Sequence, residues 1–418
     1  MPSVEGLPAR RAALQLLDSV LRRGQTLDSA AGSIRGLSPP DRALAVAIAG
    51  EALRRLPDLD TLIDGATRNR LPDDSKARMV LRLALAQKVG LGTPDHALVS
   101  TALPLVDGGP RRLVHGVLGT LLRRGFGPIG APSLPPAVEQ RWGDAWGFKT
   151  VEAARRQIAR RPALDLTFAD DTEAQAYAAE HGGVSLASRH VRLASSAVAE
   201  MSGFEGGRWW VQDLAASLPA RLIPGDARAA LDLCAAPGGK TMQLTAAGHQ
   251  VTAVDSSADR LERLKENLER THLEAKLVAA DALNWKPGKQ FDAILLDVPC
   301  SATGTFRRHP EVLYRARPRT IAESAELQRQ LLARAVEWLK CGGAFVYSVC
   351  SLEPEEGEGA IRDFLAANPD FRVDPPNPGE LPEFASASPE GWVRILPGLL
   401  EDEGGLDGFF MTRLVRAV

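Results

Sequence analysis

Residues 231–241 read Leu-Asp-Leu-Cys-Ala-Ala-Pro-Gly-Gly-Lys-Thr and decide the fold of this protein. A short apolar run, a turn of small residues and the start of a helix follow one another, which is typical of a strand–loop–helix unit. Small residues let the backbone approach a ligand closely, and the first N–H groups of the helix point toward that ligand. The stretch therefore predicts a ligand-binding loop at the carboxyl end of a parallel strand.

Strands and helices alternate on both sides of this loop. We expect parallel strands at residues 229–234, 250–255, 275–281, 291–297 and 343–350, with helices between them. Two later apolar segments are expected to form an antiparallel edge, at residues 392–398 and 409–417. The pattern predicts a doubly wound, Rossmann-like α/β domain over residues 206–418.

Two ligand classes fit the loop. A phosphate-binding loop requires G-x-x-x-x-G-K-[ST], and Gly239, Lys240 and Thr241 supply its end. Asp297 also resembles the metal-binding acid of nucleotide hydrolases. However, the first required glycine falls on Cys234, and this mismatch weakens the hydrolase interpretation.

The other ligand class is a nucleoside cofactor, which requires an acid at the end of the next strand. Asp255 closes that strand, 16 residues after Gly239, and suits ribose hydroxyls. Asp281 ends the following strand, where it would reach an adenine edge. Each aspartate alone could serve only as a helix N-cap, but a series of acids at strand ends favours a cofactor site.

Four cysteines are too few for a disulfide framework, and none forms a C-x-x-C pair suited to zinc, so we expect reduced thiols and no metal. A free cysteine is usually a small buried hydrophobe, and Cys341, in an expected turn, receives only that interpretation. Cys300 and Cys350 instead follow strand ends, at the sheet edge where such folds bind ligands. We expect both thiols to face one cleft.

The N-terminal part is all-helical in pattern. Amphipathic stripes span residues 9–23, 75–88, 94–106 and 110–124. Ser38 precedes two prolines and Asp41, the signature of a capped helix start. Glycine and proline at 125–136 predict a linker. The expected domains are residues 1–130, a linker and small α/β connector over 131–205, and the α/β domain from 206.

Composition describes a soluble globular protein, with 418 residues of which 44% are hydrophobic and 24% charged. No apolar run is long enough to cross a bilayer and no signal peptide is recognisable, so we expect a cytoplasmic monomer. Residues 1–130 hold 18 Lys and Arg against 12 Asp and Glu, although the whole chain has a net charge of −2. This basic excess suits a polyanion-binding module, and solubility alone is the alternative.

Five segments together resemble the bacterial 16S ribosomal RNA cytosine-5 methyltransferases of the RsmB/Sun family. They are DLCAAPGGKT at 232–241, VDSSADRL at 254–261, LLDVPCSATGTFRRHPE at 295–311, GGAFVYSVCSLEPEEGE at 342–358 and DGFFMTRL at 407–414. The helical segment 1–130 resembles the NusB-like RNA-binding domain that precedes the catalytic domain in that family.

The resemblance implies S-adenosylmethionine as cofactor and RNA as substrate. It assigns to the cofactor and active centre Cys234, Ala235, Ala236, Pro237, Gly238, Gly239, Lys240, Asp255, Asp281 and Asp297. It makes Cys350 the nucleophile and Cys300 the thiol that assists product release. The chain departs from the family at Val298, Val349 and Gly357, where alanine, threonine and asparagine are common.

Methylation of cytosine C5 needs a thiolate added to C6, because the unactivated ring is a poor nucleophile. Asp297 would stabilise the ring near N3. Lys240 would lower a thiol pKa, orient Asp297, or only neutralise local carboxylates. Arg307 and Arg308 would meet backbone phosphate, or form only a solvated surface pair. A non-catalytic RNA-binding assembly factor is the rival outside enzymes, disfavoured by intact Cys300 and Cys350.

Overall fold

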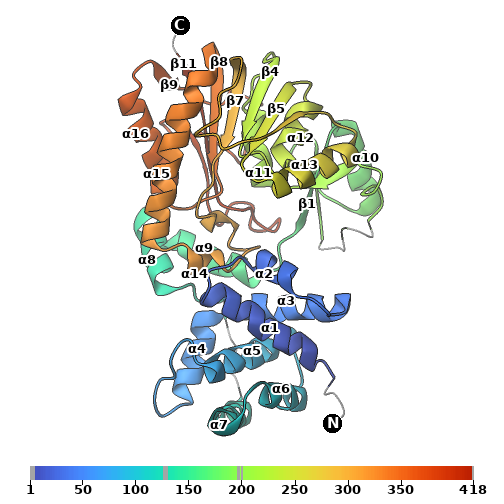
Figure 1. Cartoon of the computed structure of the whole chain (residues 1–418), viewed down its shortest axis with the longest axis vertical. Helices are drawn as coiled ribbons and strands as arrows, with labels where there is room; N and C mark the ends of the chain where they lie inside the picture. Colours follow the sequence, from blue (N-terminus) through green and yellow to red (C-terminus); the bar gives the residue numbers. More distant parts are fainter. Residues whose placement is uncertain (1–4, 126–129, 195–197, 199–200, 417–418) are drawn as a thin grey trace. The chain divides into compact units, whose positions relative to one another are not determined.

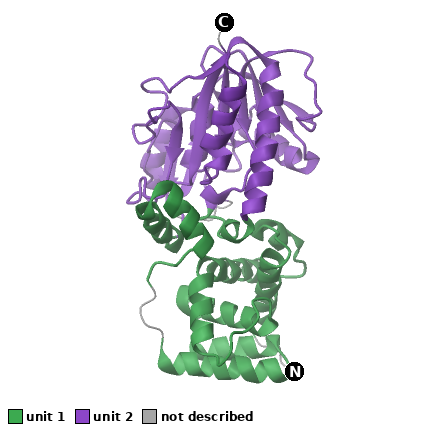
Figure 2. Ribbon diagram, turned by 90° about the vertical axis from the view of Figure 1, so that its left-hand side faces the viewer, with its two compact units in different colours: residues 1–160, 306–315 green, residues 161–305, 316–418 purple. Residues whose placement is uncertain are grey.

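The computed structural model describes residues 5–125, 130–194, 198 and 201–416. The chain forms two compact units (Figure 2). Unit 1 comprises Met1–Arg160 and Phe306–Arg315, and unit 2 comprises Arg161–Thr305 and Ala316–Val418. The predicted helical domain therefore lies within unit 1, but the unit extends past residue 130 and includes a segment from the second half of the chain.

The described residues of unit 1 form helices joined by loops, with no strand among them. Its α-helices are α1 Leu7–Leu21, α2 Leu27–Ser33, α3 Pro39–Arg54, α4 Leu56–Gly65, α5 Lys76–Leu91, α6 Asp95–Ala102, α7 Gly108–Arg124, α8 Pro136–Trp146, α9 Phe148–Ala159 and α14 Val312–Arg315. The predicted cap is confirmed, because the Ser38 side chain accepts a hydrogen bond from the Asp41 N–H. Ser75 caps α5 in the same way, through the Arg78 N–H.

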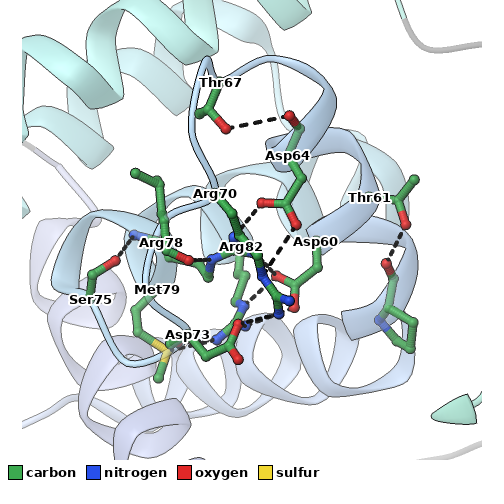
Figure 3. A network of polar contacts seen from close by, with 12 residues as sticks. Asp60, Thr61, Asp64, Thr67, Arg70, Asp73, Ser75, Arg78, Met79 and Arg82 are labelled. Atoms are coloured by element: carbon green, nitrogen blue, oxygen red, sulfur yellow. Dashed lines mark hydrogen bonds and ion pairs between the residues drawn. The ribbon is translucent and has the colours of Figure 1, made fainter.

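Helix α5 lies at the centre of unit 1 and is buried along most of its length. It carries two arginines whose side chains are almost inaccessible, Arg78 and Arg82. Figure 3 shows both guanidinium groups directed at carboxylates of α4. Arg82 binds both oxygens of Asp60 at 2.7 and 2.8 Å, and Arg78 pairs with Asp60 at 3.0 Å and with Asp64. These pairs compensate the burial of the charges and fix α4 against α5.

Residues 306–315 are part of the core of unit 1. Glu311 is 1% exposed and accepts a hydrogen bond from the Leu27 N–H at 3.0 Å. Arg307 is also 1% exposed, so both alternatives expected for it, a contact with RNA phosphate and a solvated surface pair, are wrong. The reason is tertiary, because the segment packs as an element of the helical unit and not as a loop in solvent. Arg308 is half-buried.

Unit 2 contains the predicted sheet. Its strands are β4 Ala229–Leu233, β5 Gln250–Asp255, β6 Lys276–Ala279, β7 Phe291–Asp297, β8 Leu339–Val349, β9 Phe371–Val373, β10 Val393–Ile395 and β11 Phe409–Arg416. They follow the order β10-β11-β8-β7-β4-β5-β6, and β9 also pairs with β11. The strands from β8 to β6 are parallel, and β11 is antiparallel to β8, β9 and β10. The expected antiparallel edge is confirmed.

Helices cover both faces of this sheet, as Figure 1 shows. They are α11 Leu214–Arg221, α12 Gly239–Ala246, α13 Ala258–Thr271, α15 Pro318–Ala335 and α16 Ala360–Ala367. Alternate residues of β7 enter separate cores: Ile294 and Leu296 pack with α15 and α16, whereas Ala293 and Leu295 pack with α11. Burial on both faces explains why β7 is an unbroken apolar run.

The expected connector is divided between the units. Helices α8 and α9 belong to unit 1, and a small three-stranded antiparallel sheet belongs to unit 2. That sheet consists of β1 Leu164–Phe168, β2 His190–Leu193 and β3 Trp209–Val211, with α10 Asp171–His181 beside it. Trp209 and Trp210 are 0% and 2% exposed, and each packs in a hydrophobic core. In the described parts of the chain, we find no helix with the length and hydrophobicity needed to span a bilayer.

Candidate active site

The loop between β4 and α12 takes a conformation that few residues tolerate. Cys234 has a φ of 58° and Gly238 a φ of 105°. A Cβ atom on Gly238 would lie 2.6 Å from Cγ of Leu264, so glycine is required there for space as well as for backbone angle. The N–H of Ala236 donates a hydrogen bond to Asp255 at 3.2 Å, which ties the loop to the end of β5.

A cavity of about 420 Å³ lies against this loop. Most of the predicted loop residues line it, namely Cys234, Ala235, Ala236, Pro237, Gly239 and Lys240, and so does Asp297. Its lining residues do not include Gly238, Asp255, Asp281, Cys300 or Cys350. The structure therefore divides the predicted site into a cofactor-loop cavity and neighbouring strand-end groups.

Five polar residues of this cavity escaped the sequence analysis: Gln212, Asp213, Asp232, Asn267 and Arg270. Asp213 caps α11 by accepting a hydrogen bond from the Ala215 N–H. No local sequence pattern indicates that Asp213 also lines the cavity. Asp232 does have a local sequence signal, because an acid within the apolar strand β4 is costly to bury unless its carboxylate is bound by other groups.

Asp232 is fully buried at the edge of the cavity. One carboxylate oxygen accepts a hydrogen bond from the Thr241 hydroxyl at 2.6 Å, and the other has no hydrogen-bond partner among the described residues. Burial raises the pKa of Asp232 to about 7, although the Thr241 hydrogen bond and the charge of Lys240 oppose the rise. A buried acid with an unused oxygen suits a ligand group that carries positive charge or an N–H.

Lys240 and Asp297 form a close pair. Nζ of Lys240 lies 2.7 Å from one oxygen of Asp297, and the Ser348 hydroxyl donates to the other oxygen at 2.9 Å. Asp297 and Ser348 face each other across β7 and β8. Burial acts to lower the pKa of Lys240, but the charge and hydrogen bond of Asp297 outweigh it and raise that pKa. This contact agrees both with the orientation of Asp297 by Lys240 and with simple neutralisation of nearby carboxylates.

The two strand-end thiols lie next to each other, but neither lines the cavity beside the cofactor loop, so the expectation that both face one cleft stays a prediction. Sγ of Cys300 lies 3.5 Å from Sγ of Cys350, although 50 residues separate them in sequence. The hydrogen bond with Cys350, burial, and the charge of Cys350 raise the pKa of Cys300 well above its usual value. The expectation that Cys341 is a buried residue in a turn is wrong, because Cys341 lies in the first part of β8, where the residues after Leu339 are exposed.

Asp255 and Asp281 make the local contacts of capping residues. Asp255 is 3% exposed and accepts hydrogen bonds from the Ala236 and Ser257 N–H groups. Asp281 is exposed and accepts from the Leu283 N–H at 3.0 Å. Asp255 thus holds the cofactor loop, and its contact with ribose stays a prediction, as does the role of Asp281 at adenine.

Comparison with known proteins now identifies the family. The family described as 16S rRNA methyltransferase RsmB/F matches residues 219–415, and the NusB family matches residues 7–123. Ribosomal RNA small subunit methyltransferase B of Erwinia tasmaniensis is 34% identical, over 97% of this chain and 98% of its own. The protein of that name from Xanthomonas campestris pv. campestris is 34% identical, over 99% and 98%. The chain belongs to this methyltransferase family.

The fold of the family agrees with a solved structure. The crystal structure of PH0851 superimposes with a TM-score of 0.75 and 21% identity, covering 100% of this chain and 99% of that one. Membership in a methyltransferase family decides against the nucleotide hydrolase that the loop left open. The mismatch at Cys234 is explained, since a cofactor loop does not need the first glycine of a phosphate loop.

S-adenosylmethionine, the cofactor of this methyltransferase family, fits the residues present. It carries a sulfonium and an ammonium. Asp232 belongs to the lining of the cavity, and its carboxylate has one oxygen with no hydrogen-bond partner among the described residues, which suits positive charge. The backbone of the loop 234–239 and the start of α12 supply N–H groups on the same wall. Asp232, Gln212 and the loop would hold the cofactor.

Proposed function

We propose that this protein methylates C5 of a cytosine in 16S ribosomal RNA through a covalent adduct on Cys350. The observation that carries the proposal is the pair of thiols 3.5 Å apart at the ends of β7 and β8. Asp297 ends β7 and pairs with Lys240 at the start of α12, and both residues line the cofactor-loop cavity. A methyltransferase that acted on an already nucleophilic atom would need no thiol beside the acceptor.

Cys350 performs the attack in this proposal. Its thiolate forms a bond to C6, and the electron pair of the C5–C6 double bond moves toward C5, which becomes nucleophilic. Bound S-adenosylmethionine supplies the methyl group that C5 takes. Loss of the C5 proton then restores the double bond and breaks the carbon–sulfur bond, which returns the Cys350 thiolate.

Cys300 is suited to the release step. Two of the three main causes that raise its pKa are the hydrogen bond and the charge of Cys350. Both disappear when Sγ of Cys350 becomes a thioether in the adduct, because a thioether is neutral and a weak acceptor. Cys300 is therefore easier to ionise at the stage at which a base must take the C5 proton. The proton would return to solvent after release.

Asp297 and Lys240 are proposed to stabilise the activated ring. The two hydrogen bonds to Asp297, from Lys240 and Ser348, fix its carboxylate before any substrate arrives. A preorganised charged pair costs no reorganisation when charge develops on the ring during attack. Lys240 contributes the positive member of that pair beside the cofactor loop.

The helical unit is proposed to bind RNA. Residues 7–123 match the NusB family, and residues 1–130 hold the basic excess of the chain. Phosphate contacts by Lys and Arg contribute affinity that decreases with salt. Residues 206–418 are proposed to act as the catalytic domain, which agrees with the match over 219–415. Transfer of labelled methyl to RNA would exclude the rival interpretation, a non-catalytic assembly factor.

The two thiols can be distinguished experimentally. Cys350→Ala should neither methylate RNA nor form a covalent complex, because the attacking group is absent. Cys300→Ala should attack and methylate but release slowly, so a protein–RNA band should survive denaturing electrophoresis when S-adenosylmethionine is present. Cys341→Ala is the matched control, because that thiol is exposed. A trapped complex with Cys350→Ala and none with Cys300→Ala would show that the roles are exchanged.

The substrate is tested separately. Mapping 5-methylcytosine across total RNA from cells with and without this protein should reveal one lost site in 16S ribosomal RNA. A lost site in another RNA would overturn that part of the proposal. Retained methylation by Cys350→Ala, with no trapped complex in either variant, would overturn the covalent mechanism.

A further inference from the structure

The side chain of Glu356 lies between the two turns that carry the thiols. Glu356 belongs to a π-helical turn, Glu355–Gly359, and has no exposed surface. One carboxylate oxygen accepts a hydrogen bond from the Ser301 N–H at 2.8 Å. The other accepts from the hydroxyl groups of Ser301 and Ser351. All these donors converge on one buried carboxylate.

The positions of the donors in the sequence show that Glu356 binds the residues next to both thiols. Ser301 directly follows Cys300, and Ser351 directly follows Cys350. Each turn belongs to a different parallel strand, and the backbone pairing of β7 with β8 ends at Asp297 and Ser348. Beyond those residues, two backbone hydrogen bonds still join the segments, from the Val298 N–H to the Ser348 carbonyl and from the Gly304 N–H to the Cys350 carbonyl. Glu356 is a side chain that accepts hydrogen bonds from both residues that directly follow the thiols.

A second set of hydrogen bonds holds the carboxylate and the turns in place. Gln328, on α15, donates to the Pro299 carbonyl at 3.0 Å. The Tyr347 hydroxyl donates to the Glu356 carbonyl at 2.7 Å. The Thr303 hydroxyl accepts from the Leu352 N–H at 2.9 Å, which provides another link between the turns. Because these groups are buried, loss of one partner leaves others unsatisfied.

We propose that Glu356 is a positioning residue for the covalent reaction, which sets the Cys300 and Cys350 thiols at the separation that attack and release require. This inference rests on the proposed function. Glu356 binds Ser301 and Ser351, and through these two residues it acts on the thiols. A carboxylate is needed because a single group must accept from several donors at once.

The adjacent residue provides a matched control. Glu355 has the same side chain and lies in the same π-helical turn, but it is exposed. Glu356→Gln replaces one acceptor oxygen by a donor NH₂ and keeps the volume of the side chain. Glu356→Ala removes the link altogether and would fold less readily, so the glutamine variant carries the main test.

The first experiment measures methyl transfer to RNA. Glu356→Gln should lower kcat about 10- to 100-fold, a range typical of misplacement by about 1 Å. The KM for S-adenosylmethionine should stay unchanged, because the cavity residues are not touched. Glu355→Gln should match the parent protein in both. Equal kcat values for Glu356→Gln and Glu355→Gln, or a fall in cofactor affinity alone, would overturn the proposal.

A second readout needs no RNA. The rates of alkylation of Cys300 and Cys350 by iodoacetamide, measured by mass spectrometry from pH 6 to 10, report the geometry and ionisation of the thiol pair. Glu356→Gln should change this profile for both thiols, and Glu355→Gln should not. A purely structural role would lower the melting temperature and leave the profile of the folded protein intact, which would overturn the positioning role.

The methyl-transfer assay and the alkylation profile distinguish failure of the proposed function from failure of the inference about Glu356. If the parent protein does not methylate RNA, the proposed function fails, while the alkylation profile still tests Glu356. If the parent protein methylates RNA and both profiles agree between the glutamine variants, the inference about Glu356 fails and the proposed function stands.

Discussion

Asp232 should give the stability of the protein a characteristic dependence on pH. Its pKa rises from 3.8 to about 7 in the folded chain because the carboxyl group is buried. Between these values the folded state keeps a proton that the unfolded state has lost. Stability therefore falls as pH rises through this window, and the loss is complete above pH 7.

The size of the effect follows from the gap between the two pKa values. Each pKa unit corresponds to about 1.4 kcal/mol, so the full loss is on the order of 4 kcal/mol and the part between pH 5 and pH 8 is about 3 kcal/mol. Asp232→Asn cannot ionise and should lack this component. Its stability relative to the parent protein should therefore improve by about 3 kcal/mol between pH 5 and pH 8.

Urea unfolding at several pH values, followed by near-ultraviolet circular dichroism, measures this difference. Asp226→Asn is the control, because Asp226 is exposed and its replacement should leave the pH dependence unchanged. If the free energy of unfolding depends on pH in the same way for the parent protein and for Asp232→Asn, the prediction is refuted. This result would show that the buried carboxyl group titrates as it does in the unfolded chain.

The same group predicts how cofactor binding depends on pH. A positively charged ligand favours the ionised carboxylate, so the affinity for S-adenosylmethionine should increase from pH 5 to pH 7, by at most about tenfold per pH unit, and then level off. Isothermal titration calorimetry should also show proton release on binding below pH 7. Asp232→Asn should bind weakly at every pH, and an affinity that remains pH-dependent in this variant would assign the effect to another group.

Three further predictions concern other parts of the chain. Asp255→Ala should weaken cofactor binding by about 1.5 to 3 kcal/mol, with methyl transfer recovering at high cofactor concentration; unchanged affinity would refute its assignment. Gly357→Asn introduces the residue common in the family and should destabilise the protein by roughly 1 to 3 kcal/mol, because a Cβ atom at residue 357 would overlap the buried Arg394 guanidinium. An unchanged melting temperature would contradict this prediction. Deletion of residues 1–130 should lower RNA affinity and its salt dependence while cofactor binding persists. Loss of cofactor binding by a folded truncated protein would refute the assignment of RNA binding and cofactor binding to separate parts of the chain.

Local patterns in the sequence were sufficient for the elements of the fold. The five parallel strands and the two antiparallel segments were predicted near their observed bounds, because apolar runs bounded by turn residues are a local signal. Ser38 was predicted as a cap for the same reason, since capping involves residues only three positions apart. The cofactor loop and the two strand-end thiols also followed from motif and strand position.

Tertiary structure decided what distant residues do together. No local pattern shows that residues 306–315 join the helical unit, and for this reason Arg307 was assigned to the surface although it is buried. No local pattern shows that Glu356 connects Ser301 to Ser351, or that Asp232 keeps one oxygen unpaired beside a cavity. The physical reason is the same in each case. Periodicity and capping report interactions within a few residues, whereas burial, pKa shifts and convergent hydrogen bonds arise only when separate segments pack together.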